Sequence, residues 1–295
     1  MEKTDSFGQI INKLPQIIRD DLEILPQHII DETEEIRLRC GQNIRIQGLS
    51  GDRILSHVVT SEELTKIINS LVKYSYYAYE EDLARGFVTI EGGHRVGICG
   101  KAVVKKGQTS LIREISSINI RFCKEIKGCS DNIIHYVEDK SGKPLNTLIV
   151  SAPGCGKTTL IRDIARSLSY KGIKVAICDE RSEIAGMYNC LPSFDLGPRT
   201  DILDGSPKAQ GIEMLIRSMS PQVIITDEIG RKEDIDAAGQ CLNTGVSLIT
   251  TIHGSSRRDV DNSIIGPLIS GGFFKNIIYL SRKHGPGTVA EVEHV

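Results

Sequence analysis

The segment Ser-Ala-Pro-Gly-Cys-Gly-Lys-Thr-Thr at residues 151–159 constrains the fold of this chain more than any other feature. It follows a short apolar run and precedes a helical pattern, which is the strand–loop–helix setting of a phosphate-binding loop. Gly154 and Gly156 would let backbone N–H groups turn toward phosphate oxygens, and the following helix would direct its positive end at the same anion. The alternative is a chance glycine-rich turn, but such a turn need not lie between a strand and a helix. The sequence therefore predicts a nucleotide-binding α/β domain.

We expect this loop to hold the phosphates of ATP together with Mg²⁺. Lys157 would reach the β- and γ-phosphates, and the hydroxyl of Thr158 would ligate the metal. Ser151 stands where the motif normally begins with glycine, and a small residue is compatible there because the loop only begins to bend. The predicted nucleotide-binding residues of the loop are Ser151, Ala152, Pro153, Gly154, Cys155, Gly156, Lys157, Thr158 and Thr159.

An acidic pair, Asp227–Glu228, follows the apolar run at 223–226 in the form of a Walker B motif. We expect Asp227 to hold Mg²⁺ through its water shell and Glu228 to polarise the attacking water. Solvated acids after a strand are the alternative, and the phosphate-binding loop upstream favours the functional interpretation.

Two further strand ends carry polar side chains. Glu180 follows the apolar run at 174–178, and it could be a catalytic carboxylate or part of a surface charge cluster. His253 follows the run at 246–251, where it could report the state of the γ-phosphate or be an ordinary structural histidine. Because ligands of doubly wound sheets bind beyond the carboxyl ends of the strands, these groups are expected to converge.

The chain divides into two patterns, which predict domains at 1–127 and 128–295. The second pattern alternates short apolar runs with helical stretches, as in a mostly parallel, doubly wound sheet. The first is mixed α and β, with strands and turns between two helical segments. Its predicted helices are 6–19 and 61–74, and its predicted strands are 35–39, 43–47, 86–91, 95–101 and 117–121. The second domain is predicted to begin with a helix at 131–139, and the polar segment 124–130, with Gly128, is predicted to be a hinge.

Composition limits the partners of this protein. The formal net charge is −2, Trp is absent and aromatic residues make up 5%, which argues against a nucleic-acid-binding protein. A basic face on the N-terminal strands would reopen that possibility; its arginines would be Arg37, Arg39, Arg45 and Arg53. The eight cysteines form no C-x-x-C pair and are interpreted as buried hydrophobes in a reducing cytosol. No apolar run approaches the roughly 18 residues of a membrane span, so a cytoplasmic protein that meets membranes through partners is expected.

The order of these motifs resembles the secretion ATPases of type II and type IV systems, which have an Asp box, a Walker B motif and a His box. The matching segments are Asp179–Glu180, Asp227–Glu228 and 245–253. Secretion ATPases typically have glycine before the Walker B glutamate, and this chain has Asp227. The resemblance implies a RecA-like ATPase core, hydrolysis of ATP and assembly of a homo-oligomer, expected to be a hexamer. Arginine fingers from the N-terminal domain would be Arg95, Arg113 and Arg121, each of which could instead be a solvated surface arginine.

A second resemblance covers nearly the whole chain and lies outside the generic motifs. The segments 35–39, 77–81, 92–97, 179–186, 197–201 and 208–211 are similar to those of the stage III sporulation protein AA family. This resemblance implies an ATPase of the mother cell in endospore-forming bacteria. It would drive a secretion-like channel at the forespore membranes, with an integral membrane protein as its partner. A nucleic-acid-dependent ATPase and a nucleotide-switched scaffold without turnover remain the alternatives.

Overall fold

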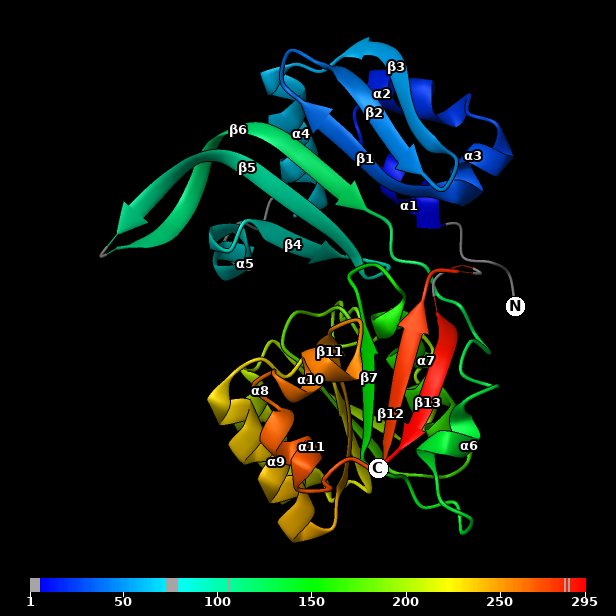
Figure 1. Cartoon of the computed structure of the whole chain (residues 1–295). Coiled ribbons are helices and arrows are strands. Elements are labelled where there is room, and N and C mark those ends of the chain that lie inside the picture. Colours follow the sequence, from blue (N-terminus) through cyan, green and yellow to red (C-terminus); the bar gives the residue numbers. More distant parts are fainter. Residues whose placement is uncertain (1–5, 73–78, 106, 284, 286) are drawn as a thin grey trace. The chain divides into compact units, whose positions relative to one another are not determined.

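The computed structural model describes residues 6–72, 79–105, 107–283, 285 and 287–295. The chain forms two compact units (Figure 1). Met1–Cys123 and Tyr188–Leu191 belong to the first unit, and Lys124–Met187 and Pro192–Val295 belong to the second. The boundary along the chain therefore lies between Cys123 and Lys124.

The first unit contains a six-stranded antiparallel sheet of order β3-β2-β1-β6-β5-β4. Its strands are β1 (Thr33–Arg39), β2 (Asn43–Gly48), β3 (Gly51–Val58), β4 (Phe87–Ile90), β5 (His94–Lys105) and β6 (Gln108–Arg121). Apolar residues alternate along β1, β2 and β6, so that one face is buried beneath helices while the other carries polar side chains. The strands predicted at 35–39 and 43–47 pair as an antiparallel hairpin, β1 with β2, and those predicted at 86–91 and 95–101 do so as β4 with β5.

Among the described residues of this unit, five helices accompany the sheet: α1 (Ser6–Ile11), α2 (Gln16–Glu23), α3 (Gln27–Glu32), α4 (Ser61–Leu71) and α5 (Glu80–Ala84). The single helix predicted at 6–19 is wrong, because Pro15 lacks an N–H and disfavours helical backbone before it, so α1 and α2 are separate. The predicted start of α4 is confirmed by a capping box between Thr60 and Glu63. The predicted end of that helix at 73–74 and the start of the segment 77–81 lie outside the described residues.

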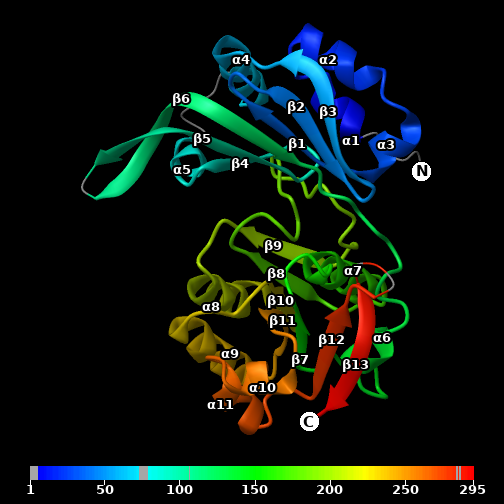
Figure 2. The same ribbon diagram turned by 45° about the horizontal axis from the view of Figure 1, so that its top comes forward.

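The second unit contains a seven-stranded sheet of order β13-β12-β7-β11-β10-β8-β9, in which only the pair β12–β13 is antiparallel among the described pairings (Figure 2). Its strands are β7 (Thr147–Ser151), β8 (Val175–Asp179), β9 (Thr200–Asp204), β10 (Val223–Thr226), β11 (Ser247–His253), β12 (Asn276–Ser281) and β13 (Thr288–His294). The predicted mostly parallel sheet is confirmed. Strands β9, β12 and β13 were not predicted from the sequence.

Helices pack on both faces of this sheet. On one face α6 (Ile134–Val137) and α7 (Lys157–Tyr170) share a core with the strands, and on the other α8 (Lys208–Met219), α9 (Lys232–Thr244), α10 (Arg257–Asp261) and α11 (Gly266–Ser270) do so. Successive residues of β7, β8 and β10 enter opposite cores, which explains their uninterrupted apolar runs. The helix predicted at 131–139 is wrong, since only the four residues of α6 are helical.

The segment 124–130 is part of the second unit and is held on helix α7, which corrects its interpretation as a free hinge. The carboxylate of Asp163 accepts the N–H groups of Gly128 (3.1 Å) and Ser130 (2.8 Å) and the hydroxyl of Ser130 (2.7 Å). Burial opposes ionisation of Asp163, but these donors and the Arg166 guanidinium hold its pKa below the usual range. Polar composition does not distinguish such a bonded segment from a mobile one.

Candidate nucleotide site

The phosphate-binding loop joins the end of β7 to the start of α7, as the sequence predicts. Gly154 has φ +70° and Gly156 has φ +89°, in the left-handed region that glycine adopts without strain. Gly156 is the N-cap of α7, so the loop ends where the helix exposes its first N–H groups. The backbone N–H of Gly287 donates to the carbonyl of Cys155 at 2.7 Å and fixes the loop from the β13 side. The loop can therefore present several N–H donors to one anion.

The ammonium of Lys157 contacts both the loop and the neighbouring strand. It donates to the carbonyl oxygens of Ser151 at 2.9 Å and Ala152 at 3.3 Å, and it lies 2.9 Å from Nδ1 of His253. Burial lowers the pKa of Lys157, and the nearby Glu228 carboxylate opposes this. Ser151, which replaces the usual glycine, is the last residue of β7; its hydroxyl donates to Ala152 and fits inside the loop.

His253 connects the phosphate-binding loop with the acidic pair. It is the last residue of β11 and lies beside Ser151 in the register of the parallel strands. An ammonium can only donate, so Nδ1 accepts from Lys157 and we assign the ring proton to Nε2. That nitrogen lies 3.2 Å from Oε2 of Glu228. The predicted residues Lys157, Glu228 and His253 therefore form one connected group.

A second group joins Glu180 and Asp227 through Lys208. The Lys208 side chain is 6% exposed, and its ammonium lies 3.2 Å from Oε2 of Glu180 and 2.8 Å from Oδ1 of Asp227. Glu180 also has the guanidinium of Arg231 at 3.8 Å. Sequence reasoning noted 208–211 only as part of a family resemblance and assigned no role to Lys208. Its position at the first turn of a helix gives no local signal of this contact.

Asp179, beside Glu180, serves the backbone. Its buried carboxylate accepts the N–H groups of Glu183 (2.9 Å), Ile184 (2.9 Å) and Ala185 (2.8 Å). Burial raises the pKa of Asp179 to about 7, and these N–H donors oppose the shift. The residue thus holds the loop after β8 in place, which leaves Glu180 as the outward carboxylate of this strand end.

The acids and the hydroxyl at this edge fit a metal that arrives with a nucleotide. Oδ1 of Asp227 is buried and forms an ion pair with the Lys208 ammonium at 2.8 Å. Burial raises the pKa of Asp227, and the charge of Lys208 opposes this. No cluster of three acidic, histidine or cysteine ligands forms within the described part of the chain. Mg²⁺ needs few protein ligands when phosphates and water supply the rest, so Thr158 and Asp227 suit it.

One basic residue near the loop was missed. An ideal Cβ on Gly154 would lie 3.6 Å from the guanidinium of Arg282, so this side chain, which follows β12, lies against the loop. The sequence analysis predicted no strand at 276–281, and without that strand nothing placed Arg282 near residue 154. Strand pairing across the whole second unit brings them together.

The predicted arginine fingers lie on the first unit. Arg95 on β5 and Arg121 on β6 are directly opposite each other, and Arg95 stacks on the ring of Phe87 at 3.8 Å. Arg113 lies opposite Lys101, farther along the same hairpin. Their role at the phosphates of a neighbouring copy stays a prediction.

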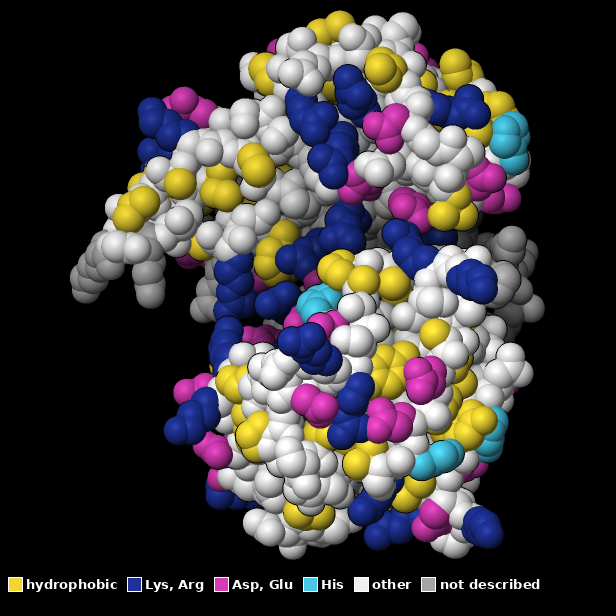
Figure 3. Space-filling view, in the orientation of Figure 1, with side chains coloured by type: hydrophobic (Ala, Val, Ile, Leu, Met, Phe, Trp, Pro, Cys, Tyr) yellow, Lys and Arg dark blue, Asp and Glu magenta, His cyan; other side chains and the backbone are white. Residues whose placement is uncertain are grey.

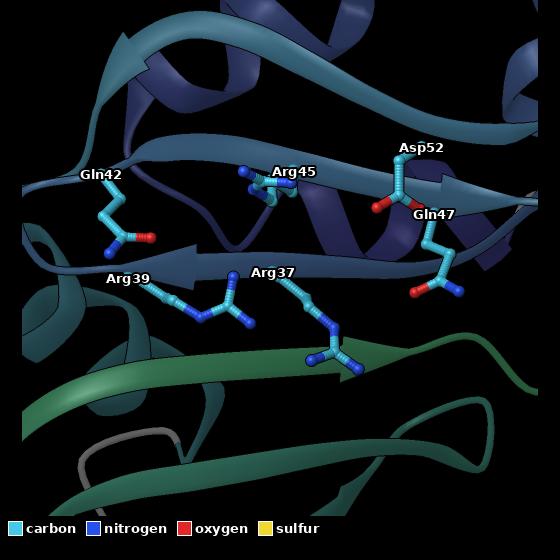
Figure 4. A pocket seen from close by; sticks show the side chains of 6 residues that line it. All are labelled: Arg37, Arg39, Gln42, Arg45, Gln47 and Asp52. Carbon is cyan, nitrogen blue, oxygen red and sulfur yellow. The ribbon is translucent and has the colours of Figure 1, made fainter.

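The predicted basic face is present on β1 and β2, with one exception. Figure 3 shows lysine and arginine side chains grouped over these strands. A cavity of about 390 Å³ is lined by Arg37, Arg39, Gln42, Arg45, Gln47 and Asp52 (Figure 4). Arg53 is opposite Ile46, which faces the core, so Arg53 belongs to the other side of the sheet. None of the lining residues is aromatic, so the cavity offers no stacking platform for bases.

Comparisons of sequence agree with the resemblance noted above. The chain matches the family described as "Sporulation stage III, protein AA" over residues 4–294. It is 40% identical over 293 residues to stage III sporulation protein AA of Bacillus subtilis (strain 168), which covers 97% of this chain and 94% of that protein. It is also 27% identical over 267 residues to protein SEEDLING PLASTID DEVELOPMENT 1 of Arabidopsis thaliana, covering 89% of this chain and 35% of that protein.

Solved structures show the same fold. The ATPase DotB of Legionella pneumophila has a TM-score of 0.60 at 20% identity, covering 90% of this chain and 76% of that one. The pilus retraction motor PilT with bound ADP has a TM-score of 0.54 at 15% identity, with the same coverage. The predicted fold, a RecA-like core preceded by a smaller α+β domain, is confirmed. With its match from residue 4 to residue 294, the chain belongs to the family of sporulation stage III protein AA.

Proposed function

We propose that this protein is an ATP-hydrolysing motor of a secretion-like channel complex that acts in endospore formation. The observation that carries the proposal is the convergence of four strand ends. Strands β7, β8, β10 and β11 end in the phosphate-binding loop, Glu180, Asp227–Glu228 and His253. Their side chains form two contacting groups, Lys157–His253–Glu228 and Glu180–Lys208–Asp227. Family membership supports the sporulation part of the proposal, and the fold supports the ATPase part.

In this mechanism the loop amides and Lys157 hold the phosphates, while Thr158 and Asp227 hold the metal. Mg²⁺, when bound, neutralises charge on the transferring phosphoryl group. Glu228 accepts a proton from, or orients, the attacking water, and His253 holds that carboxylate in place. The chain itself thereby supplies binding, orientation and a base.

The test compares two variants of the purified protein. Lys157→Ala removes a charge-assisted contact to the phosphates, so ATP turnover and the affinity for a fluorescent ADP analogue should both collapse. Glu228→Gln keeps the size but loses the base, so turnover should fall by about 10²-fold while the ADP analogue still binds. Lys171→Ala is the matched control, because Lys171 pairs with Glu138 on the surface.

Near-normal turnover in Lys157→Ala would refute the ATPase assignment. If Glu180→Gln were inactive and Glu228→Gln active, the two carboxylates would exchange roles.

The site of action is part of the proposal. Among the described residues, no helix combines the length and apolar character needed to cross a membrane. We propose that an integral membrane protein of the sporulation complex recruits this protein to the mother-cell face of the forespore membranes. If the isolated protein bound protein-free lipid vesicles tightly, recruitment by a partner would be unnecessary.

A nucleic-acid-dependent ATPase is the second candidate, and the arginine-lined cavity on β1 and β2 is the observation that favours it. Stimulation of turnover by single-stranded DNA or RNA would support it. Loss of that stimulation in Arg45→Ala would place the contact at this cavity.

A further inference from the structure

Lys208 occupies a position that local structure alone does not favour. It is the first residue of helix α8, where the positive end of the helix dipole repels a cation, and its side chain is 6% exposed. Both effects make a buried ammonium costly unless carboxylates compensate it. The two carboxylates that do so, Glu180 and Asp227, come from different strand ends.

The packing of α8 on the sheet fixes this ammonium in place. A Cβ on Gly211 would lie 2.5 Å from Sγ of Cys178, so glycine permits the helix to approach β8 closely. Cys178 precedes Asp179 at the end of that strand, and Lys208 lies one helical turn before Gly211. The close packing of the α8 backbone on β8 therefore places Lys208 at the carboxyl edge of the sheet.

We propose that Lys208 is a built-in counter-cation of the magnesium site: it positions Glu180 and Asp227 and lowers the attraction of this edge for Mg²⁺. The inference rests on the proposed nucleotide site. Lys208, Glu180 and Asp227 together carry a formal charge of −1. The ion pair with the ammonium holds Oδ1 of Asp227 at the edge where the metal is proposed to bind.

This assignment predicts that variants which change the charge in opposite directions shift the affinity for Mg²⁺ in opposite directions. Lys208→Met makes the formal charge −2 and should tighten Mg²⁺, whereas Asp227→Asn makes it 0 and should weaken Mg²⁺. The double variant Lys208→Met/Asp227→Asn returns the charge to −1 and leaves no unpaired buried Asp227. A lysine that only stabilised the fold would not produce tighter Mg²⁺ binding when removed.

The experiment measures the Mg²⁺ concentration at half-maximal binding of a fluorescent ADP analogue, which needs no turnover. We expect this concentration to fall at least threefold in Lys208→Met, to rise at least threefold in Asp227→Asn and to lie between these two values in the double variant. Lys171→Met is the control and should not shift it. ATP turnover in Lys208→Met should fall at least tenfold, because Glu180 loses its orientation.

The outcomes separate the two proposals. If the parent protein does not hydrolyse ATP but the Mg²⁺ midpoints shift as the charges of the variants predict, the role of Lys208 as a counter-cation is supported and the ATPase proposal is refuted. If the parent hydrolyses ATP and the midpoint in Lys208→Met is unchanged or higher, the counter-cation is overturned. Should Lys208→Met not fold, a midpoint for the double variant equal to that of Asp227→Asn would overturn it as well.

Discussion

His253 couples two parts of the site through the two nitrogens of one ring. Nδ1 accepts from Lys157 and Nε2 faces Glu228, so the position of the phosphate-binding lysine is linked to that of the proposed base. A phosphate that draws Lys157 away would free Nδ1 and allow the ring to rotate. This link is a physical mechanism by which His253 would report the state of the γ-phosphate, as expected from the sequence.

Replacement of His253 by alanine tests this link. Turnover should fall by about 10²-fold, since Glu228 loses its partner, while the affinity for ADP should change much less because the loop amides remain. Steady-state kinetics and ADP titration measure the two effects. His253→Gln, whose amide can approximate one of the two contacts, should retain more activity than His253→Ala. Equal activity of parent and His253→Ala would show that the histidine is only structural.

At the level of elements, a buried histidine follows the turn between β4 and β5. His94 begins β5; its Nδ1 accepts the N–H of Cys123 at 3.0 Å, and Nε2 is buried without a hydrogen bond in the described structure. Gly92, with φ +89°, packs so closely that a Cβ there would lie 2.5 Å from the ring. Burial, with a smaller effect of Lys13, lowers the pKa of His94 from 6.5 to about 4.

This depressed pKa predicts a loss of stability in mild acid. The unfolded chain binds a proton near pH 6.5 and the folded chain only near pH 4, so the contribution of neutral His94 is complete above pH 6.5 and falls as the pH drops toward 4. The whole loss is up to about 3 kcal/mol. Urea unfolding at pH 7 and pH 5 should show a smaller decrease for His94→Asn than for the parent. Identical decreases would mean that His94 titrates normally.

The sequence predicted the elements whose signal is local. The phosphate-binding loop, β10 and the hairpin of β1 with β2 each follow from a short pattern, and so do the strand ends that carry Glu180 and Glu228. The strands β9, β12 and β13 were not predicted. β9 pairs with β8 and β12 with β7, which are distant along the chain, whereas β13 pairs with its chain neighbour β12. Lys208 and Arg282 were missed because each reaches the site only after a helix or strand has packed.

At the level of the whole molecule, we expect the active form to be a hexameric ring. Family resemblance motivates this, together with arginines on the strands of the first unit. Specific ATPase activity should rise with protein concentration over the range in which light scattering shows assembly. Constant specific activity from a particle measured as a monomer would rule the ring out.

A mixing experiment tests whether an arginine acts between copies. A Glu228→Gln chain lacks the proposed base but keeps its arginines, and an Arg121→Ala chain has the opposite defect. If Arg121 serves a neighbouring site, the mixture should regain part of the activity that each variant lacks alone. The same pairing with Arg95→Ala and Arg113→Ala identifies which arginine is involved. No recovery with any of the three would argue that none acts in trans.

The order of the strands also has a consequence for synthesis of the chain. The nucleotide loop at 151–159 emerges from the ribosome before the two strands that flank it, because its strand β7 lies between β11 and β12, and the carbonyl of Cys155 is held by Gly287. Its sheet neighbours are therefore made after it, and these distant parallel pairings form slowly. A nascent chain would expose an incomplete loop until nearly all of the second unit had been translated. ATP could then stabilise the finished protein but could not guide the early stages of its folding.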